Sequence, residues 1–346
     1  MNERALKLAN RLGRDEAYYV TNEHAVRYLS GFSGEGSLLI TNEQVLIITD
    51  FRYTEAAGQL DGVYVYDIAG GIGNAFPKHI HKVRISEPDI TLSAFKRLTN
   101  VFPEIEFVSD EGEITKCRMV KSASELACIR RASAIAEHAF EEVLNIVKAG
   151  VTEKQLAFEF EWLCRRAGAE GLSFDTVVAS GENSSMPHAV VSKRKLQNGD
   201  FITFDFGCIV DGYCSDMTRT VALKSCSEEM REIYSIVLKA QLAGVEAVRA
   251  GVPCKEADAT ARSIIEAAGY GEYFGHSLGH GVGLEVHEAP NLSPKSAYVL
   301  EKNMVVSVEP GIYLPGKFGV RIEDLVVVGG ENCEILTKKS KELCII

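Results

Sequence analysis

The sequence lacks an uninterrupted apolar segment of the length that a membrane span requires, about 20 residues. Residues 1–18 mix Arg, Lys, Glu and Asp with single apolar residues, so the apolar stretch of a secretory signal peptide is also missing. The nine cysteines are scattered singly, and none forms a C-x-x-C pair. An odd, scattered set is typical of reduced thiols. We therefore expect a cytoplasmic protein with no membrane partner.

Positive charge is in short supply, because 37 Lys and Arg residues face 48 Asp and Glu, for a net charge of −11. Nucleic-acid binding needs clustered Lys and Arg, so this balance argues against a nucleic-acid partner. The stretch Gly-Gly-Ile-Gly at 70–73 is not followed by the last glycine of the G-x-G-x-x-G dinucleotide fingerprint. We therefore interpret it as a turn. What remains, 46% hydrophobic and 25% charged residues, is typical of an ordered globular fold, and 346 residues suit two domains.

The first part of the chain alternates short β-rich and helical segments, which predicts a small α/β domain. The β-rich segments are residues 17–20, 37–41, 44–49 and 63–67, and the helical segments are residues 51–59 and 91–99. A long amphipathic helix should follow, from Ser122 to Gly150, because Ser122 and Glu125 have the spacing of a capping box. We place the domain boundary just before it, which predicts domains of residues 1–118 and 119–346.

The second domain contains a diverged internal repeat. Residues 149–167 and 250–268 both begin with Ala-Gly-Val and continue as a predicted helix. Each half later carries an acidic β-hairpin, over residues 201–222 and 304–328, and the offset between the halves stays near one hundred residues. We therefore predict two related halves with a pseudo-two-fold relationship.

In the first hairpin, the two-residue turn at 211–212 sets the register. This register pairs Asp205 with Thr218 and places Asp216 diagonally across from Asp205 on the same face. Diagonal neighbours lie about 7–8 Å apart, so both carboxylates reach one site. Two buried carboxylates without a counter-charge would be costly, and bound cations remove that cost.

The second half repeats this acidic pattern. Glu309 ends the apolar strand 305–308, Glu323 lies across a turn with Arg321 on the same inward face, and His280 stands among glycines. Each residue taken singly is more often a local hydrogen-bond partner, but the matched faces and the repeat favour metal ions. Four carboxylates balance two divalent cations, and a single imidazole suits Mn²⁺ or Co²⁺ at least as well as Zn²⁺. The predicted metal ligands are Asp205, Asp216, His280, Glu309 and Glu323.

At these residues the sequence resembles the pita-bread metallopeptidases, and within them the proline-specific branch of aminopeptidase P and prolidase. The matching stretches are FDTVVASG at 174–181, PH at 187–188, TFDFG at 203–207, CSDMTRT at 214–220, HSLGHGVGLEVHE at 276–288, VEPGIY at 308–313 and GVRIED at 319–324, with YLSGF at 28–32 and TDFRY at 49–53 in the first domain. The resemblance implies an α/β (α+β) chain with a creatinase-like first domain and a pita-bread catalytic domain.

The resemblance also implies roles for the predicted ligands. Asp205 would bind one of two metal ions, Asp216 and Glu323 would bridge both, and His280 with Glu309 would complete the other site. Mn²⁺ is the expected ion, with Co²⁺ or Zn²⁺ as alternatives. A metal-bridging hydroxide would attack the carbonyl before proline, with Glu309 as the proton shuttle.

Four further residues take roles from the same resemblance. His188 and His287 would bind substrate and stabilise the developing oxyanion, and His276 and Arg321 would meet carbonyl or carboxylate groups of the substrate. The implied substrates are small proline-containing peptides, and the implied assembly is a homodimer.

Three alternatives share the fold: a non-catalytic pita-bread binding protein, a metal-free creatinase-like hydrolase and a methionine aminopeptidase. The five filled ligand positions argue against the first two, and residues 1–118 argue against the third. The choice between an Xaa-Pro aminopeptidase and an Xaa-Pro dipeptidase stays open. Residues 49–53 favour the aminopeptidase, whereas the chain length and residues 276–287 fit short prolidases equally well.

Overall fold

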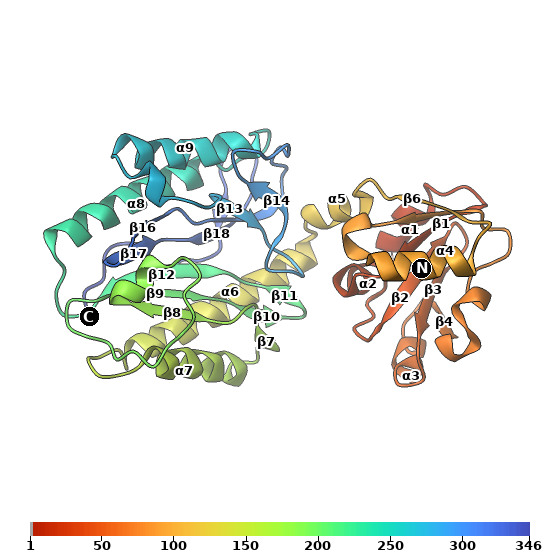
Figure 1. The fold of residues 1–346 in the computed structure, drawn as a ribbon, viewed down its shortest axis with the longest axis horizontal. Coiled ribbons are helices and arrows are strands. Elements are labelled where there is room, and N and C mark those ends of the chain that lie inside the picture. Colours follow the sequence, from red (N-terminus) through yellow and green to blue (C-terminus); the bar gives the residue numbers. More distant parts are fainter. Residues whose placement is uncertain (1–2) are drawn as a thin grey trace. The chain divides into compact units, whose positions relative to one another are not determined.

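A six-stranded mixed sheet, in the order β4-β3-β2-β1-β5-β6, forms the first of the two units into which the chain divides. The computed structural model describes residues 3–346 (Figure 1). The strands are β1 (Glu16–Val20), β2 (Gly36–Thr41), β3 (Val45–Thr49), β4 (Tyr64–Asp67), β5 (Lys82–Ile85) and β6 (Glu106–Ser109). The helices are α1 (Glu3–Ala9), α2 (Glu23–Ser30), α3 (Thr54–Gly58), α4 (Leu92–Val101) and α5 (Glu113–Met119). The predicted strands are confirmed, and the helix predicted over 51–59 is shortened to α3.

The first unit ends at Arg118 and the second begins at Met119. The long helix α6 (Ala123–Leu144) starts with the predicted capping box, in which Ser122 and Glu125 each accept a hydrogen bond from the other's backbone N–H. Its predicted end was wrong, because the helix stops at Leu144. Gly150 does have the left-handed φ of 92°, but its N–H donates to the carbonyl of Leu196, so the chain has already left the helix.

The two halves of the second unit repeat a pattern of a long helix, a shorter helix and strands. Helices α6 and α7 (Glu153–Arg166) belong to the first half, and α8 (Glu228–Ala247) and α9 (Cys254–Ala267) belong to the second. Figure 1 shows α6 and α7 on one side of the strands and α8 and α9 on the other. The predicted repeat is therefore visible as two helix pairs that enclose the sheets.

Several small sheets lie between these helix pairs, in the orders β12-β9-β8, β14-β13-β15-β18-β19, β11-β10-β7 and β16-β17. First-half strands are β7 (Gly171–Leu172), β8 (Val177–Ser180), β9 (Phe201–Phe206), β10 (Cys208–Val210), β11 (Tyr213–Cys214) and β12 (Met217–Ala222). Second-half strands are β13 (Gly279–Gly281), β14 (Glu288–Leu292), β15 (Val305–Val308), β16 (Gly311–Leu314), β17 (Phe318–Arg321), β18 (Asp324–Val327) and β19 (Glu334–Ile335). Asp205 pairs with Thr218, as the hairpin turn predicts.

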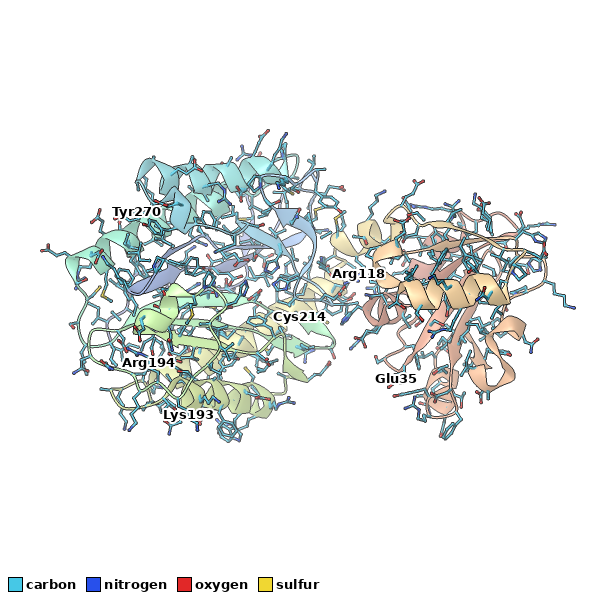
Figure 2. All side chains as sticks on the ribbon, in the orientation of Figure 1. Glu35, Arg118, Lys193, Arg194, Cys214 and Tyr270 are labelled. Atoms are coloured by element: carbon cyan, nitrogen blue, oxygen red, sulfur yellow. The ribbon has the colours of Figure 1, made fainter. Side chains whose placement is uncertain are left out.

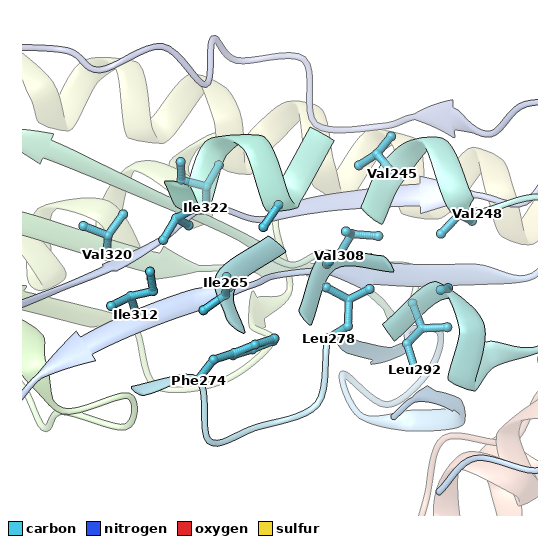
Figure 3. Close-up of a cluster of buried hydrophobic side chains, with 14 of the residues drawn as sticks. Val245, Val248, Ile265, Phe274, Leu278, Leu292, Val308, Ile312, Val320 and Ile322 are labelled. Carbon is cyan, nitrogen blue, oxygen red and sulfur yellow. The ribbon is translucent and has the colours of Figure 1, made fainter. Parts of the chain in front are cut away.

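Two apolar cores hold the strands against the helices. In the first half, the ring centroid of Phe206 lies 4.9 Å from that of Phe140 on α6 and 4.8 Å from that of Phe160 on α7. In the second half, Figure 3 shows Leu278 and Val308 within the cluster that packs under α8 and α9. Burial of these side chains contributes about 25 cal/mol per Å² of apolar surface. The cores thereby fix the strands whose ends carry the acidic residues.

The cysteines are free thiols, including the buried Cys208 and Cys214, of which Cys214 is labelled in Figure 2. No helix within residues 3–346 is both long enough and apolar enough to cross a membrane.

Candidate metal centre

The five predicted metal ligands line one cavity of about 790 Å³ in the second unit. Asp216, His280 and Glu323 offer ligand atoms that all lie within 4.8 Å of one another. The Nε2 atom of His280 is 3.1 Å from Glu309 Oε1 and 3.6 Å from Asp216 Oδ2. The structure therefore brings together carboxylates that lie about one hundred residues apart in the sequence.

Close backbone approach explains the glycines around His280. A Cβ atom on Gly279 would lie 2.0 Å from the carbonyl oxygen of Ser307, and one on Gly281 would lie 2.4 Å from that of Ala289. No side chain fits at such distances, so β13 can approach its neighbours only with glycine at both positions. The small residues thus place the imidazole against the acidic cluster.

Hydrogen bonds orient the imidazole of His280 for ligation. Its Nδ1 lies 3.2 Å from the carbonyl oxygen of Gly281, to which it donates, and this leaves Nε2 to face the carboxylates. The hydroxyl of Ser307 accepts from the His280 backbone N–H at 3.0 Å and donates to Glu309 Oε1 at 3.0 Å. Sequence analysis missed Ser307, although a lone polar residue in the apolar strand β15 was a usable signal.

The electrostatics of the cluster fit a bound cation. Burial raises the pKa of Asp216 and of Glu323 well above the usual range, and repulsion from the neighbouring carboxylates raises both further. The Oε1 atom of Glu323 is buried and has no hydrogen-bond partner among residues 3–346. Its Oε2 accepts from Thr218 Oγ1 at 2.8 Å. An unpartnered buried oxygen among crowded carboxylates is the donor set that divalent cations take up.

Glu309 and His280 form a charged pair within the same cluster. Burial opposes the charge of each, but their mutual hydrogen bond and attraction are stronger. As a result, the pKa of Glu309 falls to about 2 and the pKa of His280 rises to about 9. The imidazolium thus compensates one of the carboxylates, and a metal ion at Nε2 would take over that compensation.

Arg321 is a buried anchor at the edge of the cluster. Its Nη2 donates to Asp205 Oδ2 at 2.5 Å, and its Nε donates to Thr218 Oγ1 at 3.0 Å. Its Nη1 donates to Tyr313 OH at 2.9 Å and to the carbonyl of Pro187 at 3.1 Å. Four of the five guanidinium N–H groups are therefore committed within the protein.

The predicted histidines surround the cluster in different environments. His276 donates from Nδ1 to the carbonyl of Ser277 at 2.8 Å, and its Nε2 lies 3.0 Å from Tyr313 OH. Burial lowers the pKa of His276, and burial and the nearby His280 lower the pKa of His287. The ring of His287 lies 4.3 Å from that of His280, and His188 is exposed in the loop between β8 and β9. All three histidines line the cavity.

One face of α7 forms the wall of the cavity away from the acidic cluster. Lys154, Ala157, Phe158 and Glu161 follow the spacing of a single helical stripe, and all four line the cavity. Phe158 is 70% exposed. The cavity therefore continues past the ligands to a wall where the exposed ring of Phe158 lies between the charged residues Lys154 and Glu161.

A buried ion pair supports the segment that carries His287. Lys121 Nζ lies 2.7 Å from Glu288 Oε1, with side-chain exposures of 1% and 7%. We expect Lys121→Met to lower the free energy of unfolding by about 3 kcal/mol, because it removes the ammonium that is hydrogen-bonded to the buried Glu288 carboxylate. Urea titration of the purified variant would measure this loss. Lys121→Met combined with Glu288→Gln should lose less, whereas a full loss in the double variant would contradict this account.

This fold and site define a two-domain metallopeptidase. Residues 127–329 match the metallopeptidase family M24, and residues 3–120 match the creatinase/prolidase N-terminal domain. The chain therefore belongs to metallopeptidase family M24, and the resemblance to pita-bread enzymes is confirmed.

Known relatives cover the whole chain. Uncharacterized peptidase YqhT of Bacillus subtilis (strain 168) is 40% identical over 351 residues, with 99% of each chain covered. The solved structure of an Xaa-Pro dipeptidase from Bacillus anthracis is 44% identical, with a TM-score of 0.93 over 99% of this chain and 98% of that one. An X-Pro aminopeptidase structure from Thermotoga maritima MSB8 is 39% identical, with a TM-score of 0.91 over 99% and 100%.

Proposed function

We propose that this protein is a dinuclear metal-dependent Xaa-Pro peptidase, which hydrolyses the peptide bond before proline. The convergence of four carboxylates and one imidazole in a single cavity, with one buried Glu323 oxygen lacking a partner among residues 3–346, carries this proposal. Membership of family M24 and the proline-specific names of the solved relatives support it.

The donor set divides naturally between two cations. Asp205 would hold one ion, Asp216 and Glu323 would hold both, and His280 with Glu309 would hold the other. The oxygen-rich set favours Mn²⁺, with Co²⁺ or Zn²⁺ as alternatives. When bound, such a cation pair supplies a nucleophile from water near neutral pH and polarises the scissile carbonyl.

The remaining cavity residues would act on the substrate. Glu309, which accepts a hydrogen bond from Ser307, would move a proton between the nucleophile and the leaving proline nitrogen. The lowered pKa of His287 keeps its imidazole neutral near pH 7, so it donates one N–H toward a developing oxyanion. His188, on the exposed loop, would approach the substrate carbonyl from the open side. His276 and Arg321, which both contact the hydroxyl of Tyr313, would line the part of the cavity that receives the proline residue.

The committed donors of Arg321 favour an aminopeptidase over a dipeptidase. A dipeptidase needs a cation that binds the free C-terminal carboxylate of the proline residue. Arg321 is poorly suited to this role, because four of its five N–H groups already donate within the protein. Among the described cavity-lining residues, the other Lys or Arg is Lys154, on the far wall formed by α7. The open α7 wall also leaves room for a longer peptide. We therefore propose Xaa-Pro aminopeptidase activity, with dipeptidase activity as the second candidate that the Bacillus anthracis relative supports.

Hydrolysis of Arg-Pro-Pro and Ala-Pro side by side separates the two candidates. With Mn²⁺ added, we expect the protein to cleave Arg-Pro-Pro before the first proline, and chelator should stop the reaction. Cleavage of Ala-Pro alone would replace the aminopeptidase by a dipeptidase. Cleavage of neither peptide would contradict the proposed function as a whole.

We further propose that the protein acts in the cytoplasm as a homodimer on small proline-containing peptides. The scattered cysteines, none of which is paired in a disulfide, support the compartment, and the family resemblance supports the dimer. Light scattering on the purified protein would give the mass of two chains, and the mass of one chain would contradict the dimer.

A further inference from the structure

One fully buried carboxylate joins the two ends of the loop that carries His188. Glu153 is the first residue of α7 and is 0% exposed. Its Oε1 accepts hydrogen bonds from the backbone N–H of Ser180 at 2.8 Å and from its hydroxyl at 2.7 Å. Its Oε2 accepts from the backbone N–H of Ser192 at 3.0 Å and from its hydroxyl at 2.7 Å. Ser180 ends β8 and Ser192 follows the loop, so Glu153 closes the loop at its base.

Two further contacts complete this base. Asn183 Nδ2 lies 3.1 Å and 3.2 Å from the two oxygens of Glu153. Arg194, labelled in Figure 2, donates from Nη1 to the hydroxyl of Ser180 at 2.7 Å. An ionised carboxylate accepts at both oxygens and donates at neither, which this ring of donors requires. A glutamine at position 153 would turn one oxygen into an N–H₂ group that faces other donors.

The middle of the loop is held by separate contacts. The Gly319 N–H donates to Ser184 Oγ at 2.9 Å, and Arg321 donates to the carbonyl of Pro187. His188 follows Pro187 directly, and no residue among positions 3–346 hydrogen-bonds to its ring. Among the hydrogen bonds of the described residues, those of the loop backbone are therefore the ones that hold this imidazole at the cavity.

We propose that Glu153 is a positioning residue that holds His188 at the cavity through the base of its loop. This inference rests on the proposed catalytic role of His188. A displacement of a reacting group by about 1 Å lowers turnover by about 100-fold. Loss of the base should therefore act on catalysis through the displacement of His188.

A double-mutant cycle on Arg-Pro-Pro hydrolysis tests this inference. We expect Glu153→Gln to lower kcat by about 10- to 100-fold with a smaller change in KM, and His188→Ala to lower kcat by at least as much. The double variant should be no slower than His188→Ala alone, because Glu153 then has no imidazole to position. A purely structural role would instead lower kcat further in the His188→Ala background.

Matched variants make the outcome decisive. Glu137→Gln makes the same substitution at a half-buried carboxylate that accepts from the Lys339 backbone, away from the loop, and should keep wild-type kcat. Ser192→Ala removes one hydrogen-bond donor at the base of the loop. If Glu153→Gln does not fold, Ser192→Ala replaces it in the same double-mutant cycle with His188→Ala. If the two substitutions lowered kcat by factors that multiply in the double variant, the inference would be overturned. The proposed peptidase activity would still stand. Wild-type kcat in His188→Ala would overturn the role of His188 itself, and absence of any wild-type cleavage would overturn the proposed function.

Discussion

Replacing Glu323 with alanine is expected to abolish metal binding and peptidase activity while leaving the fold intact. Glu323 would contact both cations, and its substitution removes an oxygen that has no hydrogen-bond partner among the described residues. Loss of several kcal/mol of charge stabilisation corresponds to a decrease in kcat/KM on the order of 1,000-fold or more. Metal analysis after gel filtration and hydrolysis of Arg-Pro-Pro would measure both effects.

A second acidic residue provides the control for this experiment. Glu334 pairs with Arg130 at the surface, and both side chains are more than two-fifths exposed. Glu334→Ala should keep the metal content and kcat/KM of the wild type, because exposed ion pairs contribute little. Full activity in purified Glu323→Ala would refute the dinuclear mechanism, and an unfolded variant, visible by circular dichroism, would refute the claim that the fold survives.

Arg321→Met should give the next largest effect. The substitution removes the donor that holds Asp205 and leaves Tyr313 and the Pro187 carbonyl without a shared partner. Loss of a residue that orients a metal ligand typically lowers metal affinity by about 10- to 100-fold. We therefore expect weaker Mn²⁺ binding by calorimetry and a decrease in kcat/KM of similar size that excess Mn²⁺ partly restores.

The same substitution at a surface arginine provides the comparison. Arg130→Met breaks only the exposed pair with Glu334 and should leave Mn²⁺ affinity unchanged. If Arg321→Met bound Mn²⁺ as tightly as Arg130→Met, Arg321 would be a substrate-binding residue and not an anchor for Asp205.

The acidic hairpin of the first half was predictable from the sequence because local turn chemistry determines its register. Asp211 and Gly212 adopt positive φ values of 51° and 79°, the conformation that a tight two-residue hairpin turn favours. Once this turn is known, the alternation of strand side chains places Asp205 opposite Thr218. The capping box at Ser122 was predictable for the same reason, since all of its atoms lie within one helical turn.

Contacts between distant segments were not predictable in this way. The hydrogen bond from Thr218 to Glu323 and that from Ser307 to Glu309 depend on how the two halves pack. The end of α6 was wrongly predicted because Gly150 has the conformation of a helix C-terminus, but its N–H bonds to Leu196 on another segment. Local propensity cannot reveal such competition.

The hydrogen bonds of the Arg321 guanidinium are also contacts between distant segments that the sequence did not predict. The sequence placed Arg321 and Glu323 on one inward face, and the structure adds that four N–H groups are already engaged. The roles of the site residues in catalysis stay predictions, whereas family and overall architecture follow from motifs that span both units.

Titration of the metal-free protein with Mn²⁺ by calorimetry, with Arg-Pro-Pro hydrolysis measured on the same samples, tests the central claim most directly. The proposed site predicts binding of two ions per chain, and activity that appears only as the ions bind. A single ion at full activity, or unchanged hydrolysis after chelation, would contradict a dinuclear centre built from Asp205, Asp216, His280, Glu309 and Glu323.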